Sequence, residues 1–244
     1  LNFATGNDTV AFTDSTSFDT FTNKFNNIDL NSGNDEFDFS SAVTSDLDFS
    51  NVSNLETLNF SDNDDSVTFG SDEYTAGIRT LNLGDGTNTA DLNADTSSSV
   101  SVNGGTGNDE FVLDFSRISE KDYQVDGSAG SDTITLHGYN GQDAQSSLNN
   151  VFNSMEKLDL SDSGGTFTID ADVINSWNGT SNEFTISGAG DDTLNITTTD
   201  NNYSWSTDGT TWNSGDISDA GAGTYYIDTD NSTPSTDLTI HVVA

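Results

Sequence analysis

The amino-acid sequence predicts an all-β protein arranged as a parallel β-solenoid, in which the short strands of successive coils stack on one another. A turn rich in Gly, Asn and Asp recurs at positions 8, 35, 65, 88, 109, 132, 166 and 192, on average about 26 residues apart. Apolar and polar residues alternate on both sides of these turns, which is typical of strands with one buried face. Strands of about four or five residues are too short to be stable alone, so the repeat predicts a continuous stack.

The expected strands lie directly before and after the turns. Residues 28–30, 58–60, 81–83, 158–160 and 184–186 precede turns, and residues 37–39, 67–69, 111–113 and 134–136 follow them. Helical periodicity is weak, and only residues 144–152 and 170–176 are candidates for short helical turns.

The last part of the chain has a different composition. It holds Trp205, Trp212 and several tyrosines, with expected strands at residues 203–206, 224–228 and 238–243. An open solenoid end exposes unpaired strand edges and apolar core, so a cap is expected there. We therefore predict a repeat domain over residues 1–197 and a β-rich C-terminal cap over residues 198–244.

The chain is strongly acidic, with 41 Asp and Glu residues against five Lys and Arg and a formal net charge of -36. Most of the acids are Asp, which forms turns and supplies oxygen ligands, so the charge belongs to the turns. Charge of this density opposes compaction unless cations neutralise it. Nucleic acid is not an expected partner, because phosphate binding needs Lys and Arg. Membrane insertion is not expected either, because no apolar run is long enough for a membrane helix.

Two further features of the sequence restrict the class of protein. Cysteine is absent, so neither a disulfide framework nor thiol chemistry is predicted. The chain begins at Leu1 without a signal peptide, and we expect it to belong to a longer protein. Because thiol chemistry is absent, we expect the specific chemistry of this chain in its acidic Gly/Asp turns.

One turn carries a complete ligand motif. Residues 104–112 read GGTGNDEFV, which fits the pattern G-G-x-G-x-D-x-U-x at every defined position. Glycines let the backbone turn sharply so that carbonyl oxygens point into the loop, and Asp supplies an anionic oxygen. Calcium prefers about six to eight oxygen ligands at about 2.3–2.6 Å, and two stacked turns can supply them together. The motif therefore predicts calcium held between neighbouring coils.

The sequence resembles the RTX (repeats-in-toxin) proteins, which are exported by type I secretion and bind calcium in parallel β-rolls. Within that group it is most similar to large bacterial surface adhesins and S-layer-type proteins, and residues 152–186 resemble a stretch near the C-terminal end of giant RTX adhesins. The resemblance implies a right-handed solenoid on a bacterial cell surface. Tandem RTX arrays repeat every nine residues, whereas one turn recurs per coil here, which implies a single calcium row or several isolated sites.

The resemblance implies a set of calcium ligands in the turns. Carboxylates would come from Asp8, Asp35, Asp65, Asp109, Asp132 and Asp192, and turn geometry and carbonyls from Gly6, Gly33, Gly105, Gly107, Gly130 and Gly190. Asn88 and Thr166 stand where other turns have Asp, which implies gaps in the row. The alternative is a plain Asx turn, in which Asp bonds its own backbone. The full match favours calcium at Asp109, whereas both interpretations stay open at Asp65 and Asp8.

The mechanism that follows is folding coupled to binding of several calcium ions. Extracellular calcium modules bind at about 10⁻⁴–10⁻³ M. A site whose dissociation constant is about one hundredth of the free calcium adds about 2.7 kcal/mol of stability. We therefore expect a secreted, non-enzymatic structural module of the cell surface, an S-layer or adhesin segment. Self-assembly and cell-surface polysaccharide are further candidate interactions.

Three alternative functions are compatible with the sequence to different degrees. An enzyme is not expected, because the few basic residues and His137 and His241 are scattered without a convergent site. A calcium-dependent adhesin domain that binds glycan or protein directly stays open, with Tyr203, Trp205, Trp212, Tyr225 and Tyr226 as stacking candidates, although their alternation favours a role in the core of the cap. Ice binding is the weakest alternative, because Thr-x-Thr pairs do not recur at a fixed place in the repeat.

Overall fold

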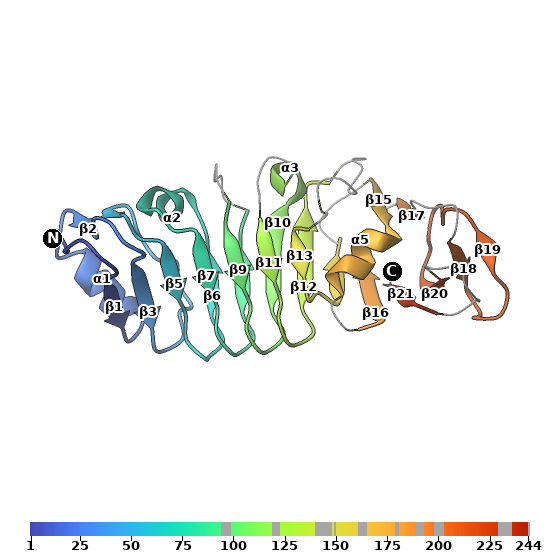
Figure 1. Cartoon of the computed structure of the whole chain (residues 1–244), viewed down its shortest axis with the longest axis horizontal. Coiled ribbons are helices and arrows are strands. Elements are labelled where there is room, and N and C mark those ends of the chain that lie inside the picture. Colours follow the sequence, from blue (N-terminus) through green and yellow to red (C-terminus); the bar gives the residue numbers. More distant parts are fainter. Residues whose placement is uncertain are drawn as a thin grey trace. The chain divides into compact units, whose positions relative to one another are not determined.

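The computed structural model shows an all-β fold with parallel stacks of strands and few helices, as the sequence predicts (Figure 1). It describes residues 1–93, 99–118, 123–139, 148, 150–160, 165–178, 181–188, 193–197, 203–228 and 236–243. The chain divides into two compact units, Leu1–Val112 with Glu120–Gly130, and Leu113–Ser119 with Ser131–Ala244. These two units do not coincide with the predicted repeat domain and cap. The boundary between residues 197 and 198 stays a prediction about where the repeats end.

The first unit contains a ladder of parallel strands, side by side in Figure 1, that follows the chain coil by coil. Its order is β1 (Thr9–Phe12), β3 (Glu36–Phe39), β5 (Thr57–Asn59), β7 (Thr80–Asn82), β9 (Ser101–Asn103) and β11 (Gln124–Asp126). Equivalent residues are in register, so that Phe37 pairs with Leu58, Leu58 with Leu81, and Leu81 with Val102. These side chains are all buried, and they form a continuous inner row.

Two smaller groups of strands complete the first unit. One is the parallel pair β2 (Ile28–Asp29) and β4 (Val52–Ser53), and the other is β6 (Ser66–Thr68), β8 (Thr89–Asp91) and β10 (Glu110–Asp114), whose last two residues belong to the second unit. Stacked phenylalanines extend the core between coils, with ring centroids 5.5 Å apart for Phe12 and Phe39 and 5.6 Å apart for Phe39 and Phe60.

Two short helices of this unit were not predicted. Helix α1 (Ser15–Thr22) begins where Asp14 accepts a hydrogen bond from the Ser17 N–H, and it buries Phe18 against Phe12. Helix α2 (Ser71–Ala76) begins where the Glu73 carboxylate accepts from the Gly70 N–H. Neither helix is long enough to give a clear apolar period, so periodicity alone could not reveal them.

The second unit continues with parallel strands and then changes to antiparallel pairing. Strands β12 (Thr133–His137), β14 (Lys157–Asp159), β16 (Glu183–Ser187) and β21 (Leu238–Val243) form a parallel run, and β15 (Thr166–Asp170) pairs with β17 (Thr193–Thr197). Strands β20 (Gly223–Asp228), β18 (Ser204–Ser206) and β19 (Asn213–Ser214) add to β21 in antiparallel pairs. The remaining elements are α3 (Phe115–Ile118), β13 (Phe152–Asn153) and α5 (Ala171–Trp177).

Strands of the structure lie at or within a residue of every expected strand, and α5 confirms the helical turn expected at residues 170–176. Most of the other expected helical turn, residues 144–152, lies outside the described residues. In the terminal part, Tyr203 and Tyr225 are buried, as expected for core residues, whereas Trp205, Trp212 and Tyr226 are half-buried. Among the described residues, no helix has the length and apolar character needed to cross a membrane.

Candidate functional site in the acidic turns

The glycines of the turns are needed where backbones of successive coils meet. Gly105 and Gly107 have φ of 91° and 138°, in the left-handed region that favours glycine. A Cβ added at Gly107 would lie 1.5 Å from the carbonyl oxygen of Gly86, and one added at Gly33 would lie 2.2 Å from that of Gly6. The turns therefore pack directly on one another.

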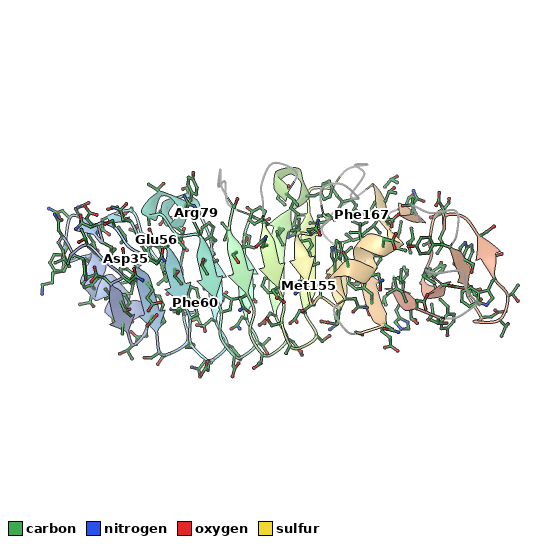
Figure 2. The ribbon with its side chains drawn as sticks, in the orientation of Figure 1. Asp35, Glu56, Phe60, Arg79, Met155 and Phe167 are labelled. Carbon is green, nitrogen blue, oxygen red and sulfur yellow. The ribbon has the colours of Figure 1, made fainter. Side chains whose placement is uncertain are left out.

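A first acidic row, defined by Asp8, Asp35 and Glu56, links three successive coils. The Asp8 N–H donates to Asp35 Oδ1 at 2.7 Å, and the Asp35 N–H donates to Glu56 Oε2 at 2.8 Å. The Asp35 and Glu56 carboxylates thus each accept the backbone N–H of the preceding coil. Glu56 belongs to this row because Glu36 pairs with Thr57, which places the residues before them in stacked positions. Asp35 and Glu56 are labelled in Figure 2.

A second acidic row, defined by Asp65, Asn88 and Asp109, repeats the arrangement at another corner of the coil. The Val43 N–H donates to Asp65 Oδ1, the Asp65 N–H to Asn88 Oδ1 at 2.8 Å, and the Asn88 N–H to Asp109 Oδ1 at 2.8 Å. The predicted carboxylate ligands of the first unit therefore lie in two hydrogen-bonded rows, and the expectation of either a single calcium row or several isolated sites stays a prediction. Asn88 does not interrupt its row, because an amide oxygen accepts the same hydrogen bond as a carboxylate.

The described residues of the second unit show a link of the same kind. The Asp132 N–H donates to Glu156 Oε2 at 2.8 Å, and the Glu156 and Lys157 N–H groups donate to the Asp132 carbonyl. Glu156 lies in the sequence MEKLDL and Glu56 in the sequence LETLNF. Both segments have Leu two residues after the Glu. In both places the backbone N–H of an Asp donates to the carboxylate of a Glu in the next coil.

Burial of these carboxylates makes their charge costly. Asp35 is 0% exposed, and its Oδ2 atom has no hydrogen-bond partner among the described residues; Asp8 Oδ2 is likewise buried without one. Desolvation by burial raises the pKa of the Asp65 and Asp109 carboxyls above the ordinary value, against the lowering effect of the backbone N–H groups that they accept from. The row thus binds backbone N–H groups at the expense of burying negative charge.

The amide at Asn88 shows what faces the second oxygen of such a carboxylate. Asn88 Nδ2 lies 3.5 Å from the carbonyl oxygen of Gly84 in its own turn, at the limit of a hydrogen bond. An aspartate in that rotamer would direct Oδ2, rather than an N–H donor, toward a carbonyl oxygen. In the neighbouring turn, Asp65 Oδ2 instead accepts from the Ser61 hydroxyl at 3.1 Å. Where a buried Asp has no such donor, a cation or a proton would compensate its negative charge.

The predicted ligands differ in how the structure places them. Asp8, Asp35, Asp65 and Asp109 lie in the two rows of the first unit, and Asp132 lies in the second unit. Asp192 and Gly190 lie outside the described residues. Gly6 has φ of 125°, like the other left-handed turn glycines, whereas Gly33 and Gly130 do not adopt positive φ. Gly33 is required instead by its close contact with Gly6.

The arrangement fits a metal ion only in one respect. The orphaned buried oxygen of Asp35 is a suitable ligand for a hard cation. However, no three His, Cys, Asp or Glu side chains within the described part of the chain gather closely enough to hold a metal. Any cation here would therefore combine single carboxylates with backbone carbonyl oxygens. Calcium accepts such ligands, because its coordination is flexible.

Glu56 and Glu156 were not among the predicted ligands, because neither is an Asp that follows a Gly-rich turn. A usable signal was present, since both residues follow an apolar residue and precede a strand of the form x-Leu-x-Phe or x-Leu-x-Leu. No glycine turn precedes these two acids, but the longer Glu side chain reaches the backbone N–H of Asp35 or Asp132 in the coil before it.

The chain matches no family model, no curated protein and no solved structure. Its class is therefore defined by the fold and the turns, as an acidic all-β protein with parallel stacks of strands and rows of hydrogen-bonded Asp, Asn and Glu side chains.

Proposed function

We propose that this chain is a non-enzymatic structural module of a secreted bacterial surface protein, an S-layer or adhesin segment, whose folding and assembly depend on calcium bound along its acidic turns. The observation that carries the proposal is the Asp35 carboxylate, which is fully buried and has one oxygen without a hydrogen-bond partner among the described residues. An uncompensated buried charge of this kind costs several kcal/mol unless it is paired.

The charge of the whole chain supports the same proposal. With a formal net charge of -36, the folded state concentrates negative charge that the unfolded chain would spread over a larger volume. Cations at the turns reduce this repulsion where the carboxylates are closest to the stacked backbone. Asp8, Asp35, Asp65, Asp109, Asp132 and Asp192 are the proposed carboxylate ligands, and the turn carbonyls supply the other oxygens.

Secretion, a right-handed solenoid and kinship with RTX proteins belong to the proposal and rest on the sequence resemblance. The recurring Gly/Asp turns and the parallel stacks are compatible with it. A chain that folds only in millimolar calcium would stay unfolded in the cytosol and fold outside the cell, which suits export of an unfolded chain. The calcium requirement is therefore the first part to test.

The test is a calcium titration followed by far-UV circular dichroism, with magnesium as control. We expect a cooperative gain of β-sheet signal with calcium at about 10⁻⁴–10⁻³ M and little gain with magnesium, which demands a small octahedral site. If protein stripped with EGTA keeps its full β-sheet signal and its melting temperature, the calcium requirement is refuted.

A second candidate function is direct, calcium-dependent binding of glycan or protein. It is favoured by Trp205, Trp212 and Tyr226, which are half-buried in the terminal part of the second unit. Half-exposed aromatic rings can stack on sugar rings, although Trp205 also lies 6.2 Å from the Tyr225 ring. A glycan array with and without chelator separates this function from a purely structural one.

A further inference from the structure

Helix α2 carries two neighbouring carboxyl groups that the acidic rows do not use. Glu73 is 3% exposed, and its Oε2 atom accepts the Gly70 N–H at 2.8 Å at the start of the helix. The side chains of Asp72 and Glu73 are in hydrogen-bonding contact with each other. Two ionised carboxylates cannot form such a hydrogen bond, because neither carries a donor. The contact therefore contains a shared proton.

The carboxyl pair also connects the helix to the coil before it. Asp72 Oδ2 accepts the backbone N–H of Phe49 at 3.1 Å, in the loop of residues 45–51 that precedes β4. The loop is thus bonded to Asp72, Asp72 to Glu73, and Glu73 to the backbone at the start of the helix. One proton completes this series of hydrogen bonds between the loop and α2.

Glu73 lines a cavity whose other walls are mainly apolar. The apolar lining includes Leu47, Phe49, Leu58, Phe60, Phe69 and Leu81. Leu47 and Phe49 belong to the loop of residues 45–51, so this loop forms one wall of the cavity. Burial, and after it the contact with Asp72, raises the pKa of Glu73 to about 8. The proton is therefore retained at neutral pH and lost under mildly alkaline conditions.

Among the described residues, no basic side chain compensates an ionised Glu73. Strands β5, β6 and β7, which also line the cavity, contain no charged residue. The charged residues in the loop and beside these strands are Asp46, Asp48, Glu56, Asp65 and Arg79. The four acids only add repulsion, and the Arg79 guanidinium donates to backbone carbonyl oxygens and lies over the Tyr74 ring. Loss of the shared proton therefore leaves two adjacent, uncompensated negative charges.

We propose that the Asp72–Glu73 pair is a pH-sensitive contact, which holds the loop of residues 45–51 over the cavity while a proton is shared and releases the loop when the proton is lost. Asp72 is half-buried and Glu73 is buried, so Asp72 can turn toward solvent with the smaller loss of packing. That movement breaks the hydrogen bond with the Phe49 N–H and opens the apolar cavity. The contact includes none of the proposed calcium ligands, so the proposal holds whether or not the turns bind calcium.

A purely structural role for Glu73, as the cap of α2, is the main alternative. An ionised carboxylate accepts a backbone N–H at the start of a helix at least as well as a neutral one does, because the helix dipole favours negative charge there. The cap by itself thus predicts that alkaline pH leaves the loop in place. The two roles differ in how opening of the cavity depends on pH.

Because the chain has no cysteine, a single introduced thiol can report this opening. Val67→Cys places a thiol in the wall of the cavity, and Val102→Cys places one at another buried position, in β9. In excess calcium, each labelling rate is divided by the rate in concentrated urea at the same pH, which cancels ionisation of the thiol. We expect a larger ratio at Val67→Cys than at Val102→Cys. The ratio at Val67→Cys should rise about tenfold per pH unit between about pH 6 and 8, the slope for release of one proton on opening.

Three further substitutions identify the carboxyl pair as the cause. Glu73→Gln has no proton to lose, so the rise at Val67→Cys should disappear; Asp72→Asn places an N–H donor beside the Glu73 carboxylate and should reduce the rise. Asp46→Asn removes an exposed charge from the same loop and should leave the rise unchanged. The proposal is overturned if the ratio at Val67→Cys does not depend on pH or if its rise persists in Glu73→Gln. Equal ratios at the two cysteines would also overturn it, because labelling would then report unfolding of the whole unit.

Discussion

Asp35→Asn tests the role of the acidic rows most directly. Asparagine keeps the oxygen that accepts the Asp8 N–H at 2.7 Å, and it replaces the orphaned Oδ2 with an N–H donor of similar size. The substitution therefore removes one buried charge without removing the link between coils. The native residue at position 88 already shows that an amide serves in such a row.

The magnitude follows from two opposing effects. The amide lacks the charge that the buried Asp35 carboxylate carries, so Asp35→Asn should stabilise the chain by about 1–3 kcal/mol in chelator. In calcium, the native chain gains about 2.7 kcal/mol for a site whose dissociation constant is one hundredth of the free calcium. The variant lacks the Asp35 carboxylate, so it gains less stability from calcium than the native chain does. Asp35→Asn should therefore be more stable than the native chain in EGTA and less stable than it in calcium.

The assay is urea unfolding in EGTA and in excess calcium, with two control variants. Asp62→Asn removes a charge from an exposed position, and it should change stability little in either buffer. Asp35→Ala removes the acceptor, and it should destabilise the chain in both. If Asp35→Asn is less stable than the native chain in EGTA, or gains as much from calcium as the native chain does, the reasoning is refuted.

Three further predictions concern other features of the first unit. Asn88→Asp adds a buried carboxylate and should destabilise the chain by about 1–3 kcal/mol in EGTA but increase its calcium-dependent gain in stability; an equal loss in both buffers would contradict this. Burial raises the pKa of Glu73 from 4.5 to about 8, so folding favours its protonated form and stability is lost as pH rises between those values. Glu73→Gln should therefore be more stable than the native chain at pH 9 by about 5 kcal/mol, and a gain in stability that is independent of pH in urea melts would exclude this cause. Gly107→Ala would place a Cβ 1.5 Å from Gly86 O and should lower the melting temperature much more than Gly6→Ala, which has open space; similar losses would show that backbone strain alone matters.

Local features of the sequence determined the fold class and most of the strands. Alternation of apolar and polar residues around Gly/Asp turns is a property of a few neighbouring residues, so it could be read at Phe37 or Leu58 without knowledge of the rest. The glycine requirement at Gly105 and Gly107 could be read in the same way, because a sharp turn with left-handed backbone favours glycine.

Which turn stacks on which was decided only by the tertiary structure. Asp35 lies 30 residues before Asp65 and 21 before Glu56, and the sequence offers Asp65 as the better match. The shorter step places Glu56 in the row, because strand pairing brings Thr57 into register with Glu36. Register depends on the path of the whole coil, including loops without a repeated pattern, so no local motif could fix it.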